Sequence, residues 1–151
     1  MDTPIRRLSF NILVKDLATS AAFYRQLAGF EQVHTSSWLI VMTVPGNEGI
    51  ELGLIDEMSE FAPRHARQAM LGTYLKLTVD DVYETLERAR ELGVEIIEEP
   101  FALAYGETRA LIRDPNGLVI DISTPTQLII DRSDGLFSPP TKNPAIDQQQ
   151  P

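Results

Sequence analysis

The chain has no cysteine, so disulfides, thiol nucleophiles and thiolate metal sites are excluded. It also has no apolar run of about 18 residues, the length that a transmembrane helix needs, and its first residues, "MDTPIRRLSF", form no apolar signal segment. Basic residues are scarce, 13 against 22 acidic ones, which gives a net charge of -9. That charge repels nucleic acids and anionic membranes and mildly favours cationic ligands, or it serves only solubility. We therefore predict a cytoplasmic protein that binds neither nucleic acid nor membrane.

The sequence repeats one pattern of apolar and capping residues. The strand-like segments "LSFNILV" (8–14) and "YLKLTV" (74–79) each precede a helical pattern. Each helix is bounded by an aspartate and a glycine: Asp16 and Gly29 in the first copy, Asp81 and Gly93 in the second. Three short β-rich segments follow each helix, at 30–34, 38–43 and 50–54 and then at 94–98, 107–113 and 118–123. The pattern predicts an α+β fold built from two strand–helix–three-strand modules.

The end of the second copy holds the clearest turn signal. In "RDPNGLVIDIST", Pro115 fixes φ, and Asn116 and Gly117 tolerate the positive φ that closes a hairpin. The strand that follows, "GLVIDIS", echoes "GIELGL" in the first copy. This comparison pairs the acid Asp121 with Glu51 if the second strand is two residues longer at its start.

The repeat predicts one domain over residues 1–124. Module one spans 6–55, a linker spans 56–72 and carries a short helix or none, and module two spans 73–124. The extension at 125–151 is rich in proline and glutamine near its end and cannot build a core alone. We therefore expect it to pack on its own domain or on a partner chain.

The paired modules resemble the vicinal oxygen chelate superfamily, which includes glyoxalase I, extradiol dioxygenases, fosfomycin-modifying enzymes and bleomycin-resistance proteins. The resemblance rests on "LVKDLATSAAFYRQLAGFE" in the first module and "RDPNGLVIDI" in the second, and it covers residues 6–124. It implies two tandem βαβββ modules that form curved half-barrels, with a ligand cavity on the concave face and a homodimer as the usual assembly.

The resemblance also implies where a divalent metal would be bound. The family's four ligand positions fall on Ser9, Glu51, Tyr74 and Asp121, where the family pattern has His, Gln or Glu, then Glu, His and Glu. Neutral hydroxyls are poor ligands for transition metals, and two carboxylates suit only a weak, hydrated Mg²⁺ or Ca²⁺ site. The only histidines, His34 and His65, lie elsewhere in the sequence. We predict no metal cofactor and, if one binds, that Glu51 and Asp121 hold it.

Strand alternation selects the remaining candidate ligand-binding residues. The side chains expected on the face away from the helices are Ser9, Asn11, Glu51, Tyr74, Lys76 and Asp121. A shared proton between Glu51 and Asp121 would be opposed by Lys76, so this set is typical of an ion-pair network more than of a catalyst. Trp38, the sole tryptophan, is either a stacking wall for a planar ligand or a core or interface residue. Phe61 is either a lid over the pocket or a plug that holds the linker down.

These observations favour a metal-free small-molecule-binding protein of the bleomycin-resistance type. It would sequester a planar or cationic drug or metabolite against Trp38, Glu51 and Asp121. Two alternatives remain: a lyase, isomerase or dioxygenase with an atypical metal site, and a module that binds another protein. Whether the protein is an enzyme stays open from the sequence.

Overall fold

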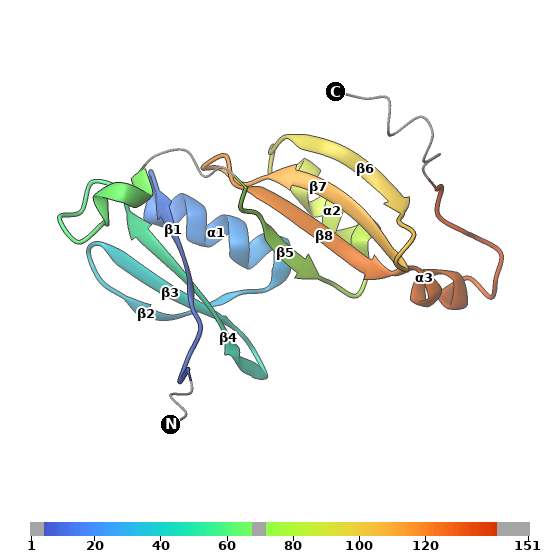
Figure 1. The fold of residues 1–151 in the computed structure, drawn as a ribbon, viewed down its shortest axis with the longest axis horizontal. Coiled ribbons are helices and arrows are strands. Elements are labelled where there is room, and N and C mark those ends of the chain that lie inside the picture. Colours follow the sequence, from blue (N-terminus) through green and yellow to red (C-terminus); the bar gives the residue numbers. More distant parts are fainter. Residues whose placement is uncertain (1–4, 68–71, 142–151) are drawn as a thin grey trace. The chain divides into compact units, whose positions relative to one another are not determined.

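The structure is a computed structural model that describes residues 5–67 and 72–141. The chain divides into two compact units, 1–72 and 73–151. Each unit contains a four-stranded sheet with a helix after its first strand, so the α+β fold with two tandem βαβββ modules is confirmed (Figure 1). Among the described residues, no helix has both the length and the apolar character needed to cross a membrane.

The first unit forms sheet A, in the strand order β1-β4-β3-β2. Its elements are β1 (Phe10–Val14), α1 (Leu17–Ala28), β2 (Glu31–Thr35), β3 (Leu39–Val44) and β4 (Asn47–Asp56), followed by the short helix η1 (Arg64–Arg67). The first strand runs parallel to β4, and the other neighbours are antiparallel. The strand β4 is longer than predicted at both ends. The sequence left undecided whether the linker contains a short helix, and η1 is that helix.

The second unit repeats this topology as sheet B, in the order β5-β8-β7-β6. Its elements are β5 (Leu75–Thr78), α2 (Val82–Glu91), β6 (Ile96–Ala102), β7 (Glu107–Arg113), β8 (Val119–Pro125) and α3 (Thr126–Arg132). The sequence did not predict α3. It packs on its own unit, where Ile129 is 8% exposed, and the chain beyond it returns to β6 through a bridge between Thr141 and Ala102.

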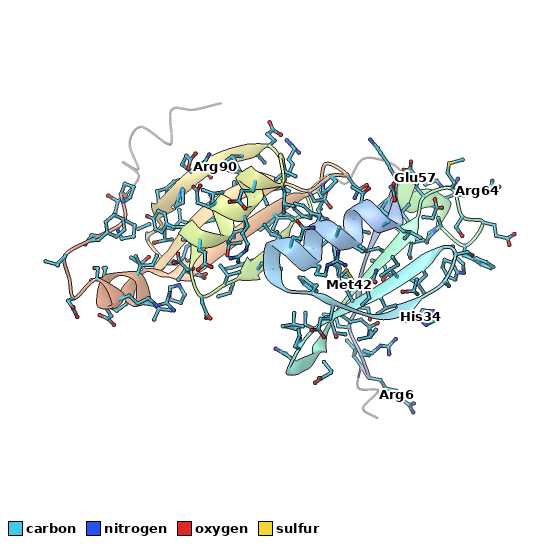
Figure 2. All side chains as sticks on the ribbon, turned by 180° about the vertical axis from the view of Figure 1, so that it is seen from behind. Arg6, His34, Met42, Glu57, Arg64 and Arg90 are labelled. Carbon is cyan, nitrogen blue, oxygen red and sulfur yellow. The ribbon has the colours of Figure 1, made fainter. Side chains whose placement is uncertain are left out.

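Each core lies between a sheet and its helix because the apolar residues alternate along the strands. On sheet A the buried strand residues are Ile12, Val14, Ile40, Met42, Leu52 and Leu54. Figure 2 shows Met42 beneath α1. On sheet B the corresponding residues are Ala110, Ile112, Ile120 and Ile122. Full burial of one such aliphatic side chain stabilises a fold by roughly 1.5–3 kcal/mol.

The predicted helix boundaries are confirmed by their caps. Asp16 accepts hydrogen bonds from the amides of Ala18 and Thr19, and Asp81 accepts them from the amides of Tyr83 and Glu84. After the helices, Gly29 and Gly93 take the left-handed conformation, with φ of 74° and 75°. Since both aspartates cap a helix in the same way, Asp16 and Asp81 are equivalent positions, and the two modules can be compared residue by residue.

That comparison corrects the pairing of Glu51 with Asp121. Equivalent residues of β1 and β5 are 65 positions apart, as Asp16 and Asp81 are. Phe10 pairs with Leu52 and its equivalent Leu75 pairs with Ile120, so the last strands align with an offset of 68. The residue equivalent to Asp121 is therefore Gly53. The two acids occupy positions that differ by two residues along their strands.

The "DPNG" turn is organised by its first residue. The carboxylate of Asp114 accepts hydrogen bonds from the amides of Asn116 and Leu118, both at 2.8 Å. Gly117 has a φ of 90°, but Asn116 keeps a negative φ, so the prediction of positive φ is right for only one of the two residues. The turn delivers the chain into β8, where Asp121 lies.

Candidate functional site

The polar candidates lie on the face of each sheet opposite its helix, which we call the open face. In sheet A this face carries Asn11, level with Gly53, and Glu51 two residues before Gly53. In sheet B it carries Lys76, which is level with Asp121. Each open face belongs to one of the two units.

On sheet A, Glu51 is the centre of a small polar cluster. The Ser9 hydroxyl donates a hydrogen bond of 3.0 Å to Glu51 Oε1, and Arg7 Nη2 lies 3.5 Å from the same oxygen. The Glu51 side chain is 16% exposed, whereas that of Arg7 is 72% exposed, so solvent screens their ion pair. Glu51 is thus already bound by a hydroxyl and a cation of its own unit.

Asn11 lies against the backbone of β4. A Cβ atom added at Gly53 would meet Asn11 Oδ1 at 2.1 Å. The φ of Gly53 is not positive, so space and not backbone conformation requires the glycine. Gly53 therefore leaves space for the Asn11 carboxamide on this face, a role that the sequence analysis did not identify.

Trp38 and Phe61 contact one another in the first unit. Their ring centroids are 4.8 Å apart at an interplanar angle of 38°, and Phe61 stays 58% exposed. The Trp38 carbonyl accepts a hydrogen bond from the Asp56 amide just ahead of β3, and alternation then places the indole on the face of Ile40. The structure therefore brings Trp38 together with Phe61, and alternation along β3 predicts that Trp38 and Glu51 lie on opposite faces of sheet A.

On sheet B, Lys76 is held by an acid that the sequence analysis did not select. Lys76 Nζ bonds Glu107 Oε1 at 2.7 Å and lies 5.5 Å from the centre of the Tyr105 ring. The hydrogen bond to Glu107 raises the pKa of Lys76, and the charge of Asp121 adds to this while partial burial opposes it. Lys76 is therefore a permanent cation at neutral pH.

Asp121 is almost fully buried although it lies on the polar face. It is 1% exposed, and its carboxylate accepts a hydrogen bond of 2.5 Å from the Ser123 hydroxyl. Arg109 is level with Ser123 on the neighbouring strand and bonds Glu98 at 3.3 Å. The open face of sheet B thus combines two cations with three acids within one unit.

Two atoms of this face have no hydrogen-bond partner among the described residues. They are Glu107 Oε2, an acceptor, and Arg109 Nε, a donor, and both are buried. The residues are two apart on β7, so their side chains leave the same face of the sheet. An unpaired buried polar atom costs about 1–3 kcal/mol. The alternation of charged with small residues in "GETRAL" was the sequence signal that could have identified both.

The donor set does not fit a divalent metal ion. The described part of the chain contains no group of three or more His, Asp or Glu side chains able to hold one. Lys76 lies level with Asp121, and Arg7 lies beside Glu51, so each carboxylate has a cationic neighbour. Tyr74, where the resemblance implies a ligand, is 57% exposed and precedes the residue paired with Ile120. His34 lies on β2, as Figure 2 shows.

Comparison with known proteins gives a family and several structural neighbours. The family model described as Glyoxalase/Bleomycin resistance protein/Dioxygenase superfamily matches residues 6–122. No curated protein matches the sequence. A glyoxalase/bleomycin resistance protein/dioxygenase family enzyme from Burkholderia phytofirmans PsJN is similar in fold, with a TM-score of 0.67, 20% identity, and coverage of 77% of this chain and 95% of that one.

Two further solved structures have the same fold. A glyoxalase-related enzyme from Fulvimarina pelagi has a TM-score of 0.64 and 20% identity, over 80% of this chain and 88% of that one. A protein from the mobile metagenome of V. Pseudocholerae has a TM-score of 0.61 and 27% identity, over 82% of this chain and 98% of that one. In each case most of the neighbour's length is covered by this chain.

Proposed function

The chain belongs to the glyoxalase/bleomycin resistance protein/dioxygenase superfamily, and from this premise we propose that it binds a small molecule without a metal ion, at the open face of sheet B. The observation that carries the proposal is the pair of buried atoms without partners, Glu107 Oε2 and Arg109 Nε. A bound ligand that satisfied both would recover the free energy that each lone polar atom costs.

The two atoms define the chemistry of the ligand. Glu107 Oε2 needs an N–H or O–H donor, and Arg109 Nε needs an oxygen or nitrogen acceptor. Lys76 adds further N–H donors beside Glu107, and the half-exposed ring of Tyr105 offers a flat apolar contact. An amide, a urea or an amino-acid-like zwitterion presents this combination. A purely cationic ligand offers only donors and would leave Arg109 Nε without an acceptor, so the proposed ligand also carries an acceptor.

The absence of a metal from this proposal follows from charge. A divalent ion at Asp121 would lie beside the Lys76 ammonium, which is level with it across the two strands. Repulsion between the ammonium and the metal ion would disfavour metal binding at this partly buried position. The alternative of a metal-dependent lyase, isomerase or dioxygenase has no comparable support from the described residues.

The test is a screen of small amides, ureas and amino acids by saturation-transfer NMR, followed by titration calorimetry of the compounds that bind. Arg109→Lys keeps the positive charge but removes the Nε donor, and we expect it to weaken binding about three- to tenfold. Arg113→Lys is the matched control, because Arg113 lies on the same strand and already pairs with Glu95 through its Nε at 2.8 Å. The proposal fails if no compound binds, or if the two variants bind alike.

We also propose that the chain forms a homodimer through the edge of sheet A. The edge strand β2 is exposed along its whole length, and Val33 at its centre is 60% exposed. A free edge with an apolar residue is a ready surface for pairing with a second copy. Sedimentation velocity should show a dimer at micromolar concentration that Val33→Lys converts to monomer. A monomer at all concentrations would contradict this.

A further inference from the structure

The C-terminal segment builds a cavity outside both open faces. The cavity measures about 210 Å³ and is lined by Asp81 and Tyr83 at the start of α2, by Ile129 and Arg132 of α3, and by Ser133 and Phe137 beyond it. Four of these six residues follow position 122, where the match to the superfamily ends. The cavity therefore depends on a part of this chain that the superfamily model does not include.

Several contacts fix the walls of the cavity. Arg132 donates a hydrogen bond to the Asp80 carbonyl, which ties α3 to the start of α2. The Ser133 hydroxyl accepts a hydrogen bond of 3.0 Å from the Phe137 amide and so closes the turn after α3. The Phe137 ring then meets the Tyr83 ring edge-on, with centroids 5.8 Å apart. Phe137 is thus held by its backbone to the turn after α3 and by its ring to Tyr83 of α2.

The polar groups of the lining have partners, with one exception. The Asp81 carboxylate caps α2, and Arg132 bonds the Asp80 carbonyl. The Tyr83 hydroxyl is buried and has no hydrogen-bond partner in residues 5–67 and 72–141. Burial raises the pKa of Tyr83, with a smaller effect from the charge of Asp81, so the phenol stays protonated at neutral pH and can donate. A ligand in this cavity must therefore supply one hydrogen-bond acceptor for the Tyr83 hydroxyl.

We propose that this cavity is a second binding site, for a neutral single-ring aromatic compound that carries a carbonyl group. The carbonyl accepts from the Tyr83 hydroxyl while the ring packs against Ile129 and Phe137. The size is adequate, because an apolar cavity of about 150 Å³ already holds benzene. The lining contains one acid, Asp81, and one base, Arg132, so it carries no net charge that would favour a charged ring over a neutral one.

Acetophenone is the probe, and its binding is followed by ¹H–¹⁵N NMR of the full chain. It carries a carbonyl acceptor but no N–H donor, so it does not match the ligand proposed for sheet B. Saturable shifts are expected at Tyr83, Ile129 and Phe137, and toluene, which lacks the acceptor, should bind more weakly. Tyr83→Phe should weaken acetophenone binding about three- to tenfold, and Phe137→Ala should weaken it further by removing a wall. Met58→Ala, which truncates a side chain that is 81% exposed and lies outside the cavity, should have no effect.

Three results would overturn the proposal: unchanged affinity in Tyr83→Phe, equal binding of toluene and acetophenone, or shifts that map to Lys76 and Glu107 instead. Circular dichroism of Phe137→Ala checks that the variant is folded, and Tyr83→Phe tests the hydrogen bond with almost no change of shape. None of these variants alters Arg109, so failure here leaves the proposal for sheet B separately testable.

Discussion

At the scale of single residues, the structure separates two acids that look alike in the sequence. Glu51 and Asp121 both lie on open faces, as alternation predicted, but register aligns Asp121 with Gly53. The alternation of residues along a strand predicts which face a side chain lies on, but not which residue of the next strand lies beside it. Lys76 was therefore predicted on the correct face, whereas its neighbours Glu107 and Arg109 were missed. The ion pair of Lys76 with Glu107 spans 31 positions of sequence, and no local pattern reveals it.

The close approach of Asn11 to Gly53 predicts how the free energy of unfolding changes when a methyl group is added at this position. Alanine normally stabilises a strand relative to glycine by about 0.5–1 kcal/mol, because less backbone entropy is lost on folding. In the parent chain, a Cβ at Gly53 would displace the Asn11 carboxamide and offset this gain. We expect Gly53→Ala to stabilise the Asn11→Ala variant but not the parent, as measured by urea unfolding. Equal effects in both backgrounds would show that Asn11 does not occupy this space.

The raised pKa of Lys76 predicts an alkaline effect. A lysine whose folded-state pKa lies above the unfolded value of about 10.4 stabilises the fold fully below that pH. The contribution is then lost as the pH rises through the folded-state pKa, which the hydrogen bond to Glu107 raises most. Lys76→Met should therefore lower the free energy of unfolding at pH 8, and its difference from the parent should shrink toward pH 11.5. The Lys76→Met, Glu107→Gln double variant is the control, and it should add little to the single change if the two residues act as a pair. A difference that grows with pH would contradict the assignment.

At the scale of elements, the helices and strands were predictable and their ends were less so. Capping residues mark helix ends locally, and both Asp16 and Asp81 were identified from sequence alone. Strand ends depend on a neighbour, so β6 continues to Ala102, four residues beyond its predicted end. The helix α3 was missed because its seven residues carry no capping side chain, and its position depends on packing against β7 and β8.

The turn before β8 gives the prediction at this scale. Asp114 is 4% exposed, and its carboxylate accepts two backbone amides at 2.8 Å. Asp114→Ala leaves both amides without that acceptor and should lower the free energy of unfolding by about 2–3 kcal/mol. Asp114→Asn keeps an acceptor oxygen and should retain most of the stability. Urea unfolding of the three proteins makes the comparison, and equal losses in both variants would show that the carboxylate charge matters more than the hydrogen bonds.

At the scale of the whole molecule, the sequence repeat was sufficient for the fold and insufficient for the site. Two copies of one pattern predict two modules, and the family match over residues 6–122 agrees with that. The site depends on which side chains face one another across strands, which requires the register. Register also changes the chemical interpretation, because it sets Lys76 level with Asp121 and leaves Glu51 on the other sheet at a position that is not equivalent.

Removal of metal tests that interpretation on the intact protein. Because a cation lies beside each of the two carboxylates, Lys76 level with Asp121 and Arg7 next to Glu51, dialysis against EDTA should leave the melting temperature and ligand affinity unchanged. Elemental analysis of protein purified without chelator should find no stoichiometric divalent ion. Lys76→Gln provides the complementary arm: removing the ammonium should increase affinity for Mn²⁺ in calorimetry, because Asp121 and Glu107 lose their cationic neighbour. A stoichiometric ion in the parent chain that Asp121→Ala releases would refute metal-free binding.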